Sequence, residues 1–65
     1  MTIADVQYET ELERIERWRY DELVRAGYEP AAARRIAERQ DVDLHRAVEL
    51  LERGCEPELA VSILL

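Results

Sequence analysis

One motif occurs twice in this chain and sets the order of its helices. The pattern Leu-x-x-x-Gly-x-Glu-Pro-x-x-Ala-x-x-Ile spans 23–36 and recurs at 50–63, so the two copies lie 27 residues apart. Glycine readily adopts the left-handed backbone that ends a helix, and proline is favoured at the first position of the next one. Each copy therefore predicts a helix, a glycine turn with positive φ and a second helix. Two copies are too few for a solenoid.

Apolar residues recur at helical spacing before the first copy of the motif. Steps of three and four residues place them on one face of a long helix, which we expect from about Asp5 to Ala26. This stripe consists of Tyr8, Leu12, Ile15, Leu23 and Ala26. Arg19 interrupts the stripe, and its aliphatic stem is expected to lie along the apolar surface. Trp18 flanks the stripe and is expected at the core or its edge.

Three shorter helices are expected after Gly27, and Pro30, Asp43 and Pro57 mark their starts. Their inward-facing residues are predicted to be Ala33, Ile36 and Ala37, then Leu44, Ala47, Val48 and Leu51, then Leu59, Ala60, Ile63 and Leu64. The turn residues Tyr28 and Cys55 are expected to be buried. The predicted fold class is all-α: a small bundle of three to four helices with a long first helix.

The length of 65 residues predicts a single domain over 1–65. One core of this size contributes roughly 3–5 kcal/mol, so short chains often add a disulfide, a metal or a partner. A single cysteine, Cys55, excludes an internal disulfide, and a single histidine, His45, argues against a structural zinc site. Self-association or a protein partner remains as the means of stabilisation.

The stretch from Leu23 to Leu51 resembles a ubiquitin-associated (UBA-like) domain, a compact three-helix bundle. The residues that carry the resemblance are the loop Ala26-Gly27-Tyr28, then Ala33, Leu44, Ala47, Val48, Leu50 and Leu51. The resemblance implies a UBA-like core over 23–51, with about 1–22 as a projecting or partner-facing part and 56–65 as a C-terminal helix. It also implies a binding patch made of Ala26, Gly27, Tyr28, Leu50 and Leu51. The chain further resembles short uncharacterised actinobacterial and phage proteins.

Catalysis is not expected. His45 and Cys55 lie near opposite ends of one predicted helix, about 15 Å apart, which is too far for a nucleophile and its base. Asp41 and Asp43 are explained as turn and cap residues rather than as metal ligands beside His45. The sequence therefore predicts neither an enzyme nor a cofactor.

The distribution of charge excludes some classes of binding partner. A net charge of -6 argues against a nucleic-acid partner, because binding nucleic acid requires basic side chains that neutralise the phosphates. The cluster Arg34, Arg35 and Arg39 is interpreted as a solvated helix face. Without a basic leader or an apolar run of about 20 residues, no membrane association is expected and a cytoplasmic location is predicted.

These observations favour a protein–protein interaction module that binds a partner, or itself as a homodimer, through the first helix and the C-terminal helix. The apolar C-terminus is expected either to pack across the first helix or to form an interface. The alternatives are a small structural subunit of a larger assembly, such as a phage particle, and a helix–turn–helix DNA-binding protein. The predicted partner-binding residues are Tyr8, Leu12, Ile15, Trp18, Tyr20, Tyr28, Leu50 and Leu64.

Overall fold

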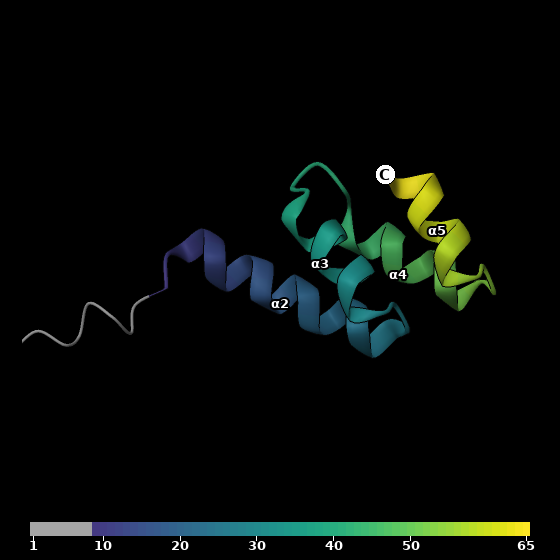
Figure 1. The fold of residues 1–65 in the computed structure, drawn as a ribbon, viewed down its shortest axis with the longest axis horizontal. Coiled ribbons are helices and arrows are strands. Elements are labelled where there is room, and N and C mark those ends of the chain that lie inside the picture. The colour runs from purple at the N-terminus through teal and green to yellow at the C-terminus, as the bar shows by residue number, and fades with distance from the viewer. Residues whose placement is uncertain (1–8) are drawn as a thin grey trace, which may run out of the picture.

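The computed structural model describes residues 9–65, which form a small all-α bundle (Figure 1). Its helices are α2 (Glu11–Ala26), α3 (Pro30–Glu38), α4 (Leu44–Glu52) and α5 (Pro57–Leu64). No strand occurs within this described part of the chain. The predicted fold class, with its long first helix, is therefore confirmed.

The long helix α2 begins at Glu11, with Thr10 as its N-cap. The predicted start of this helix at about Asp5 lies outside the described residues. The Thr10 hydroxyl accepts a hydrogen bond from the Glu13 amide, and the Glu13 carboxylate accepts one from the Thr10 amide. This reciprocal capping box satisfies amide groups that a helix start leaves without partners. The cap, rather than the apolar stripe, fixes where α2 begins.

The two copies of the repeated motif form the same turn. Gly27 has a φ of 128° and Gly54 a φ of 95°, as predicted for residues that end a helix. The Tyr28 amide donates to the Leu23 carbonyl, and the Cys55 amide donates to the Leu50 carbonyl, both at 3.0 Å. This six-residue closure is the Schellman motif. The prolines that follow are the first residues of α3 and α5, as predicted.

The core contains little large apolar surface. Its buried residues are Leu23, Tyr28, Ala33, Ile36, Ala37, Val42, Ala47 and Ala60. Half of this set is alanine, which permits close approach of the helices but removes little apolar area from water. Leu23 and Ile36 are the largest side chains that are completely buried. The burial predicted for Ala33, Ile36 and Ala37 is confirmed, and the small core is consistent with modest stability.

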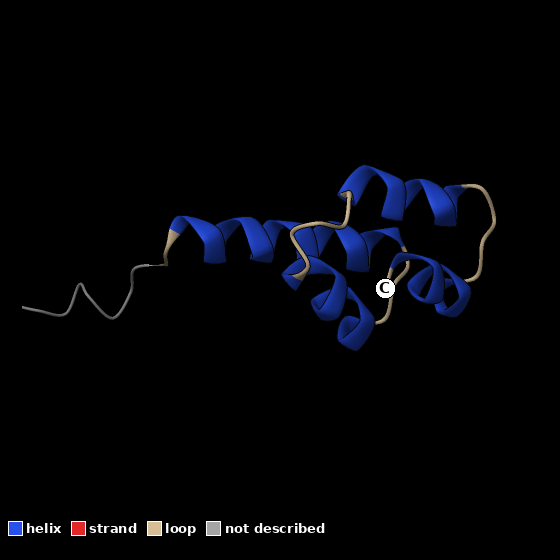
Figure 2. Ribbon diagram, turned by 90° about the horizontal axis from the view of Figure 1, so that it is seen from above, coloured by secondary structure: helices blue, strands red, loops and turns tan. Residues whose placement is uncertain are grey.

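Each described helix has two principal neighbours among the others. α2 packs against α3 and α4, whereas the principal neighbours of α5 are α4 and α3. Figure 2 shows α5 beside α3 and α4, at the end of the molecule away from the start of α2. Of the two arrangements expected for the C-terminal helix, packing across the first helix is therefore not the one adopted. No helix within residues 9–65 is long and apolar enough to cross a membrane.

Candidate interaction surface

Three large apolar side chains on the first half of α2 are exposed. Leu12 retains 52% of its accessible surface, Ile15 42% and Trp18 57%. Leu12 and Ile15 share a helix face with Arg19 and Leu23, which are buried in the bundle. We name Leu12, Ile15 and Trp18 the α2 ridge. Leu12 and Ile15 continue the core-facing stripe beyond the point where the bundle covers it, and Trp18 lies beside them on the flank of the helix.

The helix lengths explain why the ridge is uncovered. With 16 residues, α2 is about 24 Å long, whereas α3 with 9 residues is only about 14 Å long. Roughly 10 Å of α2 therefore extends past its neighbour, and Figure 1 shows this half projecting from the bundle. The capping box and an ion pair between Arg17 and Glu9 support the projecting turns. The ridge is thus presented on a well-formed helix.

Arg19 joins the ridge to the bundle in a way that the sequence did not suggest. Its side chain is only 8% exposed, and its head as well as its stem is buried. Nη2 lies 2.8 Å from the Val42 carbonyl oxygen, 3.0 Å from that of Arg39 and 3.3 Å from that of Ile36. Nε donates to the Ala37 carbonyl at 3.3 Å. The guanidinium therefore caps the C-terminal end of α3 and holds the loop that follows it.

Trp18 differs from its predicted environment. The tryptophan was expected at the core or its edge, but its exposure of 57% makes it part of the surface. The physical reason is that Trp18 lies off the stripe occupied by Arg19 and Leu23, on a side of α2 that neither α3 nor α4 covers. Tryptophan is enriched among residues that dominate binding energy at protein interfaces. Its exposure fits its place among the predicted partner-binding residues.

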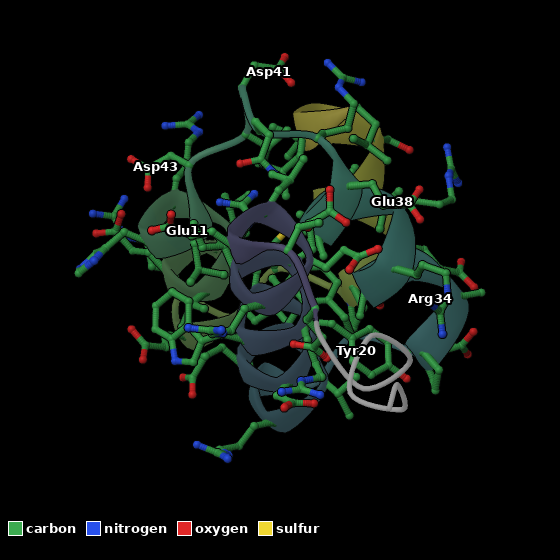
Figure 3. The ribbon with its side chains drawn as sticks, turned by 90° about the vertical axis from the view of Figure 1, so that its left-hand side faces the viewer. Glu11, Tyr20, Arg34, Glu38, Asp41 and Asp43 are labelled. Atoms are coloured by element: carbon green, nitrogen blue, oxygen red, sulfur yellow. The ribbon has the colours of Figure 1, made fainter. Side chains whose placement is uncertain are left out.

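The other predicted partner-binding residues have varied environments. Tyr20 is half-buried, and the Arg34 guanidinium lies 5.2 Å from the centre of its ring, on the side of the bundle seen in Figure 3. Leu50 and Leu64 are half-buried and pack against the core. Tyr8 lies outside the described residues. The α2 ridge is therefore the part of the predicted surface that the structure leaves most exposed.

Tyr28 is wrongly placed among the surface residues. It is 2% exposed, and its hydroxyl donates a hydrogen bond to the Ala47 carbonyl at 2.7 Å. Burial raises the pKa of Tyr28, and its Coulombic interaction with Cys55 raises it further. The side chain therefore ties the first turn to α4 as a neutral phenol. Its inward orientation, predicted from the repeat, is confirmed.

The second turn is less well buried than the first. Cys55 is half-buried rather than buried as predicted, whereas Tyr28 at the equivalent position is 2% exposed. On α5, Leu59 and Ile63 are 56% and 50% exposed, so their predicted inward orientation is wrong. Ala60 is the buried residue of α5. The two repeats share a backbone but not a burial pattern, since α3 buries Ala33, Ile36 and Ala37 whereas α5 buries Ala60 alone.

The patch implied by the UBA-like resemblance is partly brought together. A side chain added at Gly27 would meet Leu51 Cδ1 at 3.3 Å, so the first turn lies directly against the end of α4. However, Leu50 and Leu51 are half-buried against the core, and Tyr28 is buried. The apolar side chains of this patch therefore serve mainly to pack the bundle.

Within residues 9–65, the side chains most often used in catalysis lie in different environments. His45 is exposed and Cys55 half-buried. Glu49, four residues after His45 on the same helix, accepts a hydrogen bond from Arg53 at 3.1 Å. A hydrogen bond from Arg39 lowers the pKa of Asp41, but this pair lies on an exposed loop. Within residues 9–65, no three His, Cys, Asp or Glu side chains are grouped so that they could hold a metal ion.

Comparison with known proteins adds no relative. No protein-family model, curated protein or solved structure matches the chain. The likeness to UBA domains therefore stays a prediction, and the functional argument depends on the surface itself.

Proposed function

We propose that this protein is a non-enzymatic protein–protein interaction module, acting in the cytoplasm, that docks through the α2 ridge. The observation that carries the proposal is the exposure of Leu12, Ile15 and Trp18 on a capped helix that projects from the bundle. An amphipathic helix whose apolar face is uncovered is suited to packing against another helix or a groove.

The energetics support a partner on this surface. Complete burial of a large apolar side chain is worth about 1.5–3 kcal/mol. Because the three side chains of the ridge are roughly half exposed, covering them would recover about 3 kcal/mol. This is comparable to the 3–5 kcal/mol that a single core of this size contributes. Docking would therefore stabilise the fold as well as form a complex.

Self-association through the ridge is one form of this function. Identical chains most often associate as two-fold dimers, in which the same patch is used twice. The ridge of one copy would then pack against the ridge of the next. The UBA-like core would serve as the scaffold that presents α2.

A second candidate is a structural subunit of a larger assembly. Leu59 and Ile63 expose apolar surface on α5, and Figures 1 and 2 place α5 away from the projecting start of α2. Two apolar patches in separate places would let one copy contact two neighbours. Such head-to-tail contacts produce rings or filaments rather than closed dimers.

Variants of the ridge test the proposal. Immobilised wild-type protein should retain its partner from the cells that produce it, and sedimentation equilibrium should show whether a second copy is that partner. Leu12→Glu should abolish both kinds of association without loss of helicity. Asp21→Ala, an exposed change elsewhere on α2, is the matched control. Retention that is equal for Leu12→Glu and the control would contradict the proposal.

A further inference from the structure

We propose that the groove between the two Glu-Pro turns binds a cationic segment with aliphatic side chains, contributed by a partner protein. The groove has a volume of about 760 Å³ and lies between the start of α3 and the start of α5. Binding sites commonly have volumes of about 300–1,000 Å³. This assignment rests on the proposed interaction function. It adds a second binding surface, separate from the α2 ridge.

The groove combines an aliphatic floor with acidic sides. Ala32 on α3 and Val61 on α5 contribute apolar surface, and both pack against the core, so the floor is fixed. The charged lining consists of three carboxylates, those of Glu29, Glu56 and Glu58, and one guanidinium, that of Arg35. Lysine and arginine match this combination, because their stems lie along apolar surface while their heads reach an anion.

The internal repeat explains how two of these carboxylates come to line one groove. Glu29 and Glu56 occupy equivalent positions, immediately before the prolines that begin α3 and α5. Neither side chain forms the capping hydrogen bond that residues at this position often make. Within residues 9–65, the acidic side chains that form ion pairs are Glu9, Glu22, Asp41 and Glu49, none of which lines the groove. The carboxylates of the groove are thus available to an incoming cation.

Charge complementarity favours a different protein over a second copy. The net charge of -6 makes two copies of this chain repel at long range, whereas it attracts a cationic segment. Complementary charge at an interface mainly improves the rate of encounter and the choice of partner. The groove therefore selects for a basic segment.

A titration followed by nuclear magnetic resonance tests the assignment. The isotopically labelled full chain is titrated with a short capped peptide that alternates leucine and arginine, and separately with the same peptide carrying glutamine in place of arginine. We expect the arginine peptide to shift the amide signals of Ala32 and Val61 while the signal of Val42, in the loop after α3, stays unchanged. Binding should weaken as salt is raised from about 50 to about 300 mM.

Charge-neutral variants provide the decisive comparison. Glu29→Gln combined with Glu56→Gln should weaken binding of the arginine peptide about fivefold, the effect expected for losing two partly exposed ion pairs. Glu11→Gln combined with Glu52→Gln makes the same change in net charge on exposed residues outside the groove and should alter binding by less than about twofold. Unchanged core signals, such as that of Ile36, would show that each variant is folded.

The outcomes separate this assignment from the proposed function. Equal binding of the glutamine peptide, shifts confined to the α2 ridge, or no saturable binding would each overturn the groove assignment. Leu12→Glu should bind the arginine peptide as the wild type does. The two proposals can therefore fail separately. If the groove binds the arginine peptide but the ridge variants still retain their partner, this assignment is upheld and the function proposed for the ridge is contradicted.

Discussion

Replacing Arg19 with methionine should remove most of the stability of this fold. The guanidinium is almost completely buried, and its acceptors are four backbone carbonyls at the end of α3 and in the loop after it. Methionine fills a similar volume but donates no hydrogen bond. Because the acceptors are backbone carbonyls, they remain in the variant when the arginine is removed. These carbonyls would then lack a hydrogen-bond donor or would have to bind water.

The size of the effect follows from the geometry. Nη2 has only two N–H groups for three acceptors, so the shorter contacts, to Val42 at 2.8 Å and Arg39 at 3.0 Å, carry most of the interaction. A hydrogen bond from a charged group contributes about 1.5–3 kcal/mol. The positive charge at the C-terminal end of α3 adds about 0.3–1 kcal/mol. Partial hydration of the exposed loop offsets some of the loss, which leaves an expected destabilisation of about 2–4 kcal/mol.

Urea denaturation followed by circular dichroism measures this effect. With a total stability of about 3–5 kcal/mol, the variant should retain only about 1 kcal/mol, so roughly one molecule in six should be unfolded at room temperature. This fraction should refold when trimethylamine N-oxide is added. Arg14→Met removes an exposed arginine from the same helix and should change stability by no more than about 0.5 kcal/mol. A variant at Arg19 as stable as the one at Arg14 would refute the role assigned to the buried guanidinium.

The remaining predictions concern the two glycine turns and Tyr28. Gly54→Ala should lower the stability by about 1–2 kcal/mol, because Gly54 has a positive φ that alanine adopts only with strain. Gly27→Ala should lower it more, because Gly27 also has a positive φ and a new Cβ there would press on Leu51. Equal urea midpoints for the two variants would contradict this difference. Because the pKa of folded Tyr28 lies above its ordinary value of 10.0, the stability that the neutral phenol contributes should be complete below pH 10 and be lost as the pH rises through the raised pKa. Tyr28→Phe should abolish this alkaline loss in pH-dependent melting and cost about 1 kcal/mol at neutral pH, since the Ala47 carbonyl loses its donor.

Local chemistry made much of the fold predictable. The glycine turns and the prolines that open α3 and α5 follow from the backbone preferences of single residues. The cap at Asp43 follows from its side-chain carboxylate, which accepts a hydrogen bond from the His45 amide. The capping box of α2 also has a sequence signal, since threonine at 10 precedes glutamate at 13 by three residues. The apolar periodicity obscured this signal, because it continues back to Tyr8 whether or not those residues belong to α2.

Tertiary relationships were less predictable. Helical periodicity shows that Leu59 and Ile63 share a face with each other, but not that the neighbouring helices leave this face of α5 uncovered. Arg19 illustrates the same limit, since its burial depends on carbonyls 17 to 23 residues away in the sequence. For the candidate surface, Leu12 and Ile15 followed from their spacing, whereas the exposure of Trp18 required the positions of α3 and α4.

The α2 ridge as a docking surface is tested most directly by photo-crosslinking in the cells that produce the protein. A photoreactive amino acid at position 15 would lie on the ridge, whereas one at position 21 would lie on an exposed part of the same helix outside it. We predict that position 15 gives a crosslinked product, either with a second copy or with a different protein, and that position 21 does not. This product should disappear when Leu12→Glu is added. Identical products from both positions, or no product from position 15, would contradict an interaction function for this surface.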